Sequence, residues 1–282
     1  MFNALLLFLS ILSCQPDYGM SYEVVEEIQP TEVVVDSFLQ PKPPEKLDVL
    51  IVLDTSGSMN DNFQQVSTGV ELLRGDIEKL TLDYKIGFIN SGMMSPYFAG
   101  PYDYTSDSID FLLAPYALGA DWYEQGFQSM YEFVTATPEG AEFFRDDADK
   151  LIIFVSDENE QGAIPTDVFH DWLVEKFELV QHDVVAIVQL DNGECPLNWE
   201  YDVGQKYIDL VAYYGKVGID ICSDWEAWLG DSTFLVGEID YINLTQTPLE
   251  DSLVVYRNGL ETQLWYYLTE TNTVYLDFVP DP

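Results

Sequence analysis

Residues 47–59 read LDVLIVLDTSGSM, and this stretch decides the fold of the chain. Its first part, Leu47 to Leu53, is almost continuously apolar and contains several β-branched side chains. Such a run is typical of a strand that is buried on both faces of a parallel sheet. A helical pattern begins near Asn62, so Asp54 lies at the carboxyl end of the strand. Open α/β sheets bind their ligands at that edge.

A second apolar run ends in the same way. Residues 151–155 read LIIFV and are followed by Ser156 and Asp157. Two parallel strands that end in Asp54 and Asp157 would bring both carboxylates to one edge of the sheet. Strand and helix signals alternate from Leu47 to about Leu190, which predicts a doubly wound, mostly parallel α/β sheet with helices on both faces. We expect further strands at 84–89 and 183–188, and helices near 62–80, 106–113, 168–179 and 207–214. The segment 118–127 is expected to open another helix that ends at about Thr135.

The turn after the first strand offers oxygen ligands at close spacing. Asp54, Ser56 and Ser58 supply one carboxylate and two hydroxyls, a set that suits a hard divalent cation. A simpler interpretation is that Asp54 and Ser56 cap the following helix. The order hydrophobic-Asp-Thr also has some similarity to an aspartic protease. That chemistry needs two such carboxylates, whereas Ser56 interrupts the motif and the chain has no second copy.

This turn resembles the metal-ion-dependent adhesion site of von Willebrand factor A (VWA) domains, whose first loop reads Asp-x-Ser-x-Ser. The resemblance covers about residues 45–230. Asp54, Ser56 and Ser58 match the first metal loop, and Asp157 matches the third, where it would act directly or through water. The resemblance implies a bound Mg²⁺, with Mn²⁺ or Ca²⁺ as alternatives. It also implies a protein-binding module rather than an enzyme, in which an acidic side chain of the partner completes the metal shell.

The second metal loop departs from the family pattern. VWA domains place a Thr there, but this chain has no Thr or Ser between Pro115 and Gln128. We expect Glu124 to supply an oxygen instead, directly or through water. Two other functions stay open, namely an envelope scaffold with a non-functional site and a metal-dependent hydrolase. A hydrolase would need a base or nucleophile near the metal, and we expect structural roles for His170 and His182, the only histidines.

Composition narrows the choice of partners. At 282 residues with 47% hydrophobic residues, the chain can form one α/β domain at 47–230 and a smaller unit. Its 50 acidic and 11 basic residues give a net charge of −39. That charge argues against binding to nucleic acid or to anionic membranes. It would attract divalent cations and basic partners, or it could simply keep the protein soluble in a salty medium.

The N-terminal segment has the features of an export signal. Residues 1–14 are apolar, uncharged and too short to span a bilayer. Ile11-Leu12-Ser13-Cys14 resembles a bacterial lipobox, which would make Cys14 a lipid-modified residue and the only membrane anchor. We therefore expect a lipoprotein of the bacterial outer membrane or cell surface, with a periplasmic or secreted protein as the alternative. Residues 15–46 are interpreted as an extended tether that ends in a proline-rich segment.

Two further features concern the C-terminal part of the chain. Cys195 and Cys222 are expected to form a disulfide in an exported protein, and two free thiols are the alternative. Residues 231–282 predict a small antiparallel β module, with a hairpin turn at Arg257-Asn258-Gly259. Its strands are expected at 234–239, 252–256, 263–267 and 273–278. The whole organisation is similar to bacterial VWA lipoproteins with a short β tail, in stretches at 35–40, 143–148 and 221–222.

Overall fold

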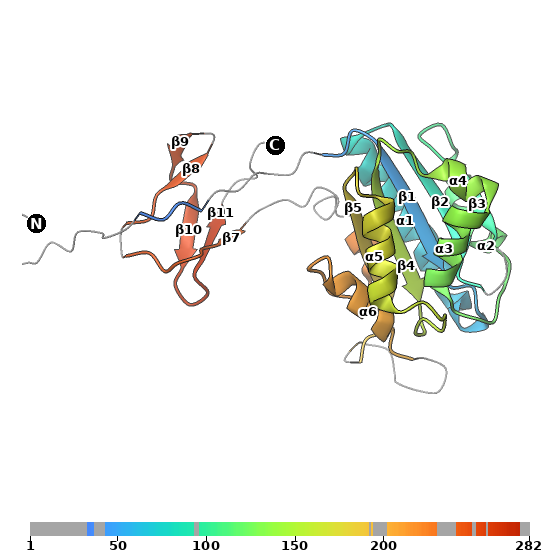
Figure 1. Cartoon of the computed structure of the whole chain (residues 1–282). Helices are drawn as coiled ribbons and strands as arrows, with labels where there is room; N and C mark the ends of the chain where they lie inside the picture. Colours follow the sequence, from blue (N-terminus) through green and yellow to red (C-terminus); the bar gives the residue numbers. More distant parts are fainter. Residues whose placement is uncertain are drawn as a thin grey trace, which may run out of the picture.

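The structure is a computed structural model (Figure 1). It describes residues 33–36, 43–92, 96–191, 193, 202–229, 241–249, 252–257 and 259–276. The leader at 1–14 with Cys14, the residue Cys195 and the strand expected at 234–239 lie outside the described residues. The lipid anchor and the disulfide therefore stay predictions. No helix in the described part of the chain is both long enough and apolar enough to cross a membrane.

A six-stranded sheet forms the centre of residues 47–229, in the order β3-β2-β1-β4-β5-β6. All neighbouring strands are parallel except β3, which runs antiparallel to β2. Within this register Leu53, the last residue of β1, lies opposite Val155 of β4. The strands are β1 (Leu47–Leu53), β2 (Tyr84–Asn90), β3 (Phe98–Tyr102), β4 (Asp149–Ser156), β5 (His182–Val188) and β6 (Ile219–Asp220).

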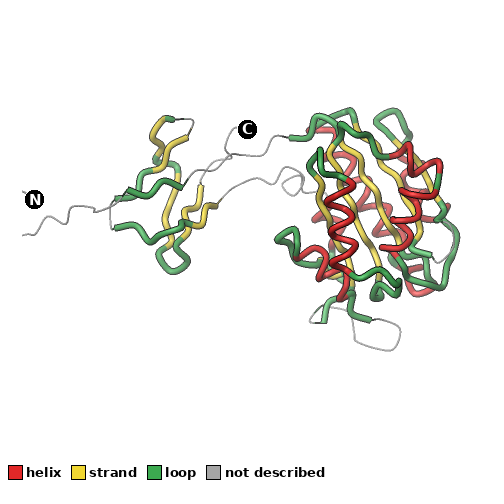
Figure 2. The backbone as a smooth tube through the Cα atoms, viewed as in Figure 1, coloured by secondary structure: helices red, strands yellow, loops and turns green. Residues whose placement is uncertain are grey.

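Helices cover both faces of this sheet (Figures 1 and 2). The helices are α1 (Phe63–Leu80), α2 (Ser108–Ala117), α3 (Gly126–Ala136), α4 (Pro138–Phe143), α5 (Thr166–Lys176), α6 (Gln205–Ala212) and α7 (Trp225–Leu229), together with a 3-10 turn, η1 (Gly57–Asp61). Helices α1, α2 and α7 share a hydrophobic core with one face of β1, and α3 to α6 share a second core with the other face. The predicted doubly wound α/β fold is confirmed.

The long elements follow from local sequence patterns. In α1, Val66, Val70, Leu73 and Ile77 recur at helical spacing and are buried against the sheet. Every side chain of β1 is buried, as expected for a central parallel strand. The short elements α4, β6 and α7 were not predicted, because each is too short to show a periodic pattern.

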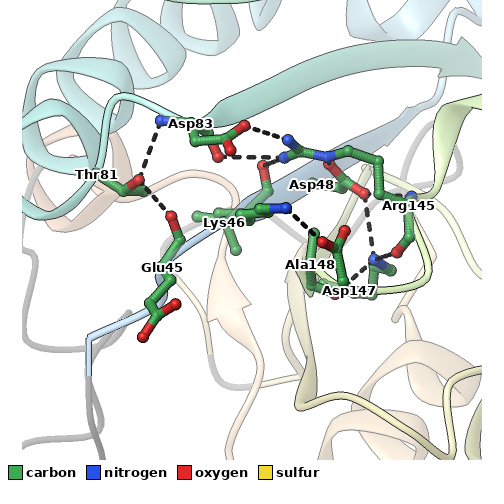
Figure 3. A network of polar contacts seen from close by, with 10 residues as sticks. Glu45, Lys46, Asp48, Thr81, Asp83, Arg145, Asp147 and Ala148 are labelled. Atoms are coloured by element: carbon green, nitrogen blue, oxygen red, sulfur yellow. Dashed lines mark hydrogen bonds and ion pairs between the residues drawn. The ribbon is translucent and has the colours of Figure 1, made fainter.

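The amino edge of the sheet carries a buried network of ion pairs (Figure 3). Asp48, inside the otherwise apolar β1, has a fully buried carboxylate. It accepts hydrogen bonds from Arg145 Nε at 2.7 Å and from Lys150 Nζ at 3.2 Å. Arg145 also pairs with Asp83. At this end of the strands, each buried negative charge therefore has a cationic partner.

Residues 241–276 form separate antiparallel strands (Figure 2). The strands are β7 (Tyr241–Asn243), β8 (Val255–Arg257), β9 (Leu260–Thr262), β10 (Trp265–Leu268) and β11 (Thr273–Leu276). They pair in the order β10-β11-β7, and β8 pairs with β9. The predicted hairpin is confirmed, since Arg257 lies opposite Leu260 and Gly259 has a φ of +78°. Its second strand is β9, which was not predicted. Asp36 of the expected tether accepts a hydrogen bond from Thr245 Oγ1 at 2.8 Å.

Candidate metal centre

The first loop places Asp54 directly beside the end of β4. The Asp54 amide donates to the carbonyl of Val155 at 2.9 Å, which continues the parallel pairing by one residue. Its carboxylate is buried and accepts two hydrogen bonds. Oδ1 accepts from the Ser56 amide at 2.8 Å, and Oδ2 accepts from Ser156 Oγ at 2.7 Å. The first loop is therefore fixed to the fourth strand through both backbone and side chain.

The two serines connect Asp54 with the third loop. Ser56 Oγ and Ser58 Oγ lie 2.9 Å apart, and Ser58 Oγ donates to Asp157 Oδ1 at 3.3 Å. Asp157 is completely buried, yet its Oδ2 has no hydrogen-bond partner. A buried carboxylate oxygen without a partner is costly, and such atoms are uncommon in folded proteins. The four residues that matched the VWA motif thus form one connected group with an unused acceptor.

The second loop brings Glu124 to the same edge. The Asp121 amide donates to the Thr55 carbonyl at 3.3 Å, which ties this loop to the first. Gly92, in the loop that follows β2, leaves room for Asp121, because a Cβ there would lie 1.8 Å from Asp121 Oδ2. Glu124 is buried, and its carboxylate accepts a hydrogen bond from Gln161 Nε2. Glu124 thus lies close enough to Asp54, Glu158 and Asp157 to feel their charges, but its carboxylate already has a protein partner.

The carboxylates at this edge repel one another. Burial, followed by the charge of Asp54, raises the pKa of Asp157 to about 7, although the hydrogen bond from Ser58 opposes the rise. Burial, followed by the charges of Asp54 and Glu158, raises the pKa of Glu124 to about 8. Burial also raises the pKa values of Asp54 and Glu158. In the described part of the chain, no Lys, Arg or His forms an ion pair with any of these four carboxylates.

The side-chain oxygens at this edge are of the chemical type that binds a divalent cation. Among the described residues, no three Asp, Glu, His or Cys side chains converge as a ready ligand group. An ion at this edge would therefore use the hydroxyls of Ser56 and Ser58 together with the carboxylates of Asp54 and Asp157. Hydroxyl and carboxylate oxygens suit a hard cation, which commonly keeps water molecules in its shell. Glu124 would act through such a water or after release from Gln161.

Two residues of this edge were missed by the sequence analysis. Ser156 holds Asp54, and Gln161 holds Glu124. Glu158, which follows the second apolar run, adds a further negative charge. Ser156 could have been found, because a hydroxyl residue at the end of an apolar strand stands out. Gln161 gave no signal. His182 begins β5 and therefore lies at the opposite end of the sheet, while His170 stacks on Tyr213 with ring centroids 4.2 Å apart.

Comparison with known proteins identifies no family for this chain. No protein-family description matches it, and no curated protein matches it. Solved structures of proximal thread matrix protein 1 from the mussel byssus are similar to it. One crystal form is 12% identical in sequence, with a TM-score of 0.47. The match covers 70% of this chain and 46% of the matrix protein chain. A form with a zinc-occupied MIDAS motif shows 12% identity and a TM-score of 0.48, with 67% and 46% covered. The chain thus spans less than half the length of these proteins.

Proposed function

We propose that this chain is a protein-binding module whose binding depends on a divalent cation at the carboxyl edge of the sheet. The observation on which this rests is the connected group of Asp54, Ser56, Ser58 and Asp157. It joins the ends of two adjacent strands, leaves one buried carboxylate oxygen unpaired, and has no ion-paired cation within the described residues. A bound cation would satisfy that oxygen and offset the repulsion between the carboxylates.

The chemistry of the group favours an acidic ligand on the partner. Ser56 and Ser58 are neutral, so a divalent ion held by them and by few carboxylates keeps part of its positive charge. An incoming carboxylate would then be attracted to the ion strongly, because the interaction takes place at a partly desolvated edge. We place Mg²⁺ first among the candidate ions, with Mn²⁺ and Ca²⁺ next, since all three prefer oxygen ligands.

Calorimetry would test the metal site directly. Mg²⁺, Mn²⁺ and Ca²⁺ are titrated into the chelator-treated protein, the Asp54→Asn variant and the Asp157→Asn variant. We expect saturable one-site binding that is lost in both variants. Asp171→Asn is the matched control, because the Asp171 side chain is 84% exposed on α5 and, among the described residues, contacts only the neighbouring His170. This control should bind metal as the unchanged protein does.

Other results would favour the remaining functions. Weak uptake at many sites, equal in all variants, would mean that only the acidic surface binds ions. The chain would then be better described as a scaffold. Metal-dependent hydrolysis of a test ester or phosphate, lost in Asp54→Asn, would instead support an enzyme.

We further propose that the protein is exported and anchored through a lipid on Cys14. The apolar leader and the lipobox-like ending support this proposal. Expression in a bacterium with a clickable palmitate analogue should label the full chain in the membrane fraction. The Cys14→Ser variant should lose the label and leave the membrane fraction. Equal labelling of both chains would contradict the anchor and leave the metal proposal untouched.

A further inference from the structure

Helix α2 has apolar side chains on its solvent face as well as on its core face. Phe111, Ala114 and Pro115 are buried against the rest of the domain. Four large apolar residues of the helix are exposed, and they follow the spacing i, i+3, i+4, i+7 that places side chains on one stripe. The members of this α2 stripe are Ile109 (53% exposed), Leu112 (36%), Leu113 (55%) and Tyr116 (56%).

Such a stripe needs an explanation that a single exposed residue does not. Isolated apolar side chains are common on protein surfaces, but contiguous apolar patches are typical of interaction sites. A helix of this length at the surface of a domain normally carries polar residues on its outer face. The α2 stripe makes up four of the ten residues of the helix, and all four are large, apolar and open to solvent. Helix α2 therefore has two apolar faces, and the domain itself covers only one of them.

The stripe runs toward the candidate metal centre. Tyr116, near the end of α2, packs edge-to-face on Phe63 with ring centroids 5.5 Å apart. Phe63 is the first residue of α1 and follows the first metal loop after a single turn. The loop that leaves α2 is bonded to the same metal loop through Asp121 and Thr55. A partner seated along the stripe would therefore end beside the metal loop.

The charges around the stripe indicate the chemistry of its occupant. Asp107 and Asp110 form a capping box at the start of α2. Arg74, which contacts Ser108 of α2, is already paired with Glu71 and Glu78. The surroundings of the stripe are thus acidic, in a chain with a net charge of −39. A second copy of the chain or an anionic membrane would be repelled, whereas a segment with Lys or Arg beside its apolar residues would be attracted.

We propose that the α2 stripe is a docking site for a basic amphipathic helix of another protein. The apolar face of that helix would pack on Ile109, Leu112, Leu113 and Tyr116, and its Lys or Arg residues would lie against the flanking carboxylates. This is the common mode in which an amphipathic helix is recognised through anchors at i, i+3, i+4 and i+7. The site adds a contact to the proposed metal-dependent function and does not require it.

A designed peptide can test the site before any partner is known. The probe is a fluorescein-labelled 18-residue peptide of Leu and Lys with its leucines on one helical face. Binding to the full chain is followed by fluorescence anisotropy in EDTA at about 0.15 M salt, where charges beyond roughly 8 Å are screened. We expect saturable binding that Leu112→Ser/Leu113→Ser weakens on the order of tenfold, as for loss of central anchor residues. A peptide of the same composition with scrambled order should bind more weakly.

The matched control removes two apolar side chains elsewhere that are more exposed than Leu112 and Leu113. Leu179→Ser/Val217→Ser changes two residues that are 82% and 84% exposed outside α2, and it should leave the affinity unchanged. Equal binding of ordered and scrambled peptides, or equal affinity in both double variants, would show attraction by the acidic surface alone and overturn the proposal. Self-association of the chain that Leu112→Ser/Leu113→Ser abolishes would assign the stripe to a second copy instead. Because the assay contains EDTA, its result does not depend on the metal site.

Discussion

Buried carboxylates have different partners at the two ends of strands β1 and β4. At the amino edge, Asp48 is fully buried and bonded to both Arg145 and Lys150 (Figure 3). At the carboxyl edge of the same strands, Asp54 and Asp157 are just as buried but bond only to hydroxyls and amides among the described residues. Among the described residues, Arg145 and Lys150 form ion pairs with Asp48 at the first edge, whereas no cation forms an ion pair with Asp54 or Asp157 at the second.

This difference distinguishes a charge that is neutralised within the protein from the group that we propose to hold a cation. A buried carboxylate that is paired within the protein is satisfied at all times and has no capacity for a ligand. A group of carboxylates without cations is unfavourable alone and becomes favourable when an ion arrives from solution. The comparison therefore predicts that the two edges respond differently to mutation, metal and pH.

The largest effect is expected at the amino edge. Asp48→Leu would leave the ammonium of Lys150, whose side chain is 1% exposed, without its carboxylate. Loss of one partner from a buried pair costs about 3–5 kcal/mol of unfolding free energy. Urea denaturation followed by circular dichroism would measure it.

The control for this prediction removes both partners. The double variant Asp48→Leu/Lys150→Met should recover most of the stability, because the buried ammonium is gone and Arg145, which is 21% exposed, keeps its ion pair with Asp83. Lys46→Met, at the exposed pair with Asp147, should leave the denaturation midpoint almost unchanged. If Lys46→Met lowered the unfolding free energy as much as Asp48→Leu does, the predicted difference between buried and exposed ion pairs would be wrong.

The next effect concerns metal at the carboxyl edge. Mg²⁺ at about 100 times its Kd should raise the unfolding free energy by about 2.7 kcal/mol, because only the folded chain brings the ligands together. Asp157→Asn should abolish this gain, and Asp48→Leu should keep it, since Asp48 lies at the other edge. Thermal melts with Mg²⁺ or EDTA would show both results. If Mg²⁺ stabilised Asp157→Asn as much as it stabilises the unchanged chain, the ion would have to bind at another site.

A third prediction uses the raised pKa values of the carboxyl edge. Asp157 and Glu124 hold their protons in the folded chain up to about pH 7 and about pH 8, whereas in the unfolded chain their pKa values are 3.8 and 4.5. Between these limits the folded chain binds more protons, so its stability in EDTA should fall as the pH rises. Denaturation midpoints at pH 5, 7 and 8.5 would measure the fall.

Metal and mutation should both reduce this pH dependence. Metal ligands must be deprotonated, so the stabilisation by Mg²⁺ should grow over the pH range in which the metal-free chain weakens. Glu124→Gln should flatten the upper part of the curve in EDTA. A curve in Glu124→Gln identical to that of the unchanged chain would argue against Glu124 as a member of the cluster.

The smallest effect is expected from a single hydroxyl. Ser58→Ala removes one neutral ligand and a 3.3 Å hydrogen bond to Asp157. The contact of this hydroxyl with the ion should contribute about as much as a hydrogen bond, about 1 kcal/mol, so metal affinity should fall by about fivefold while the fold is retained. Calorimetry on Ser58→Ala and Ser58→Thr would compare loss and retention of the hydroxyl. Retained affinity in Ser58→Ala would remove Ser58 from the ligand set.

The sequence by itself determined the long elements and the position of the carboxyl edge. Two apolar runs that end in Asp54 and Asp157 predicted parallel strands with both carboxylates at one edge, because burial on both faces leaves a pattern that is visible without a structure. The spacing of Asp54, Ser56 and Ser58 also indicated a metal loop, since all three belong to one turn. These inferences depend on neighbours in the chain, where sequence distance and spatial distance agree.

Only the tertiary structure decided how the charges are matched. Asp48 gave no sign of its pairing, because Arg145 and Lys150 lie about a hundred residues away and meet it only through the register of β1 and β4. The hydrogen bond from Gln161 to Glu124 and the exposure of the α2 stripe have the same origin. Periodicity shows which side chains share a face, whereas packing between distant segments determines which charges find a partner and which remain for a ligand.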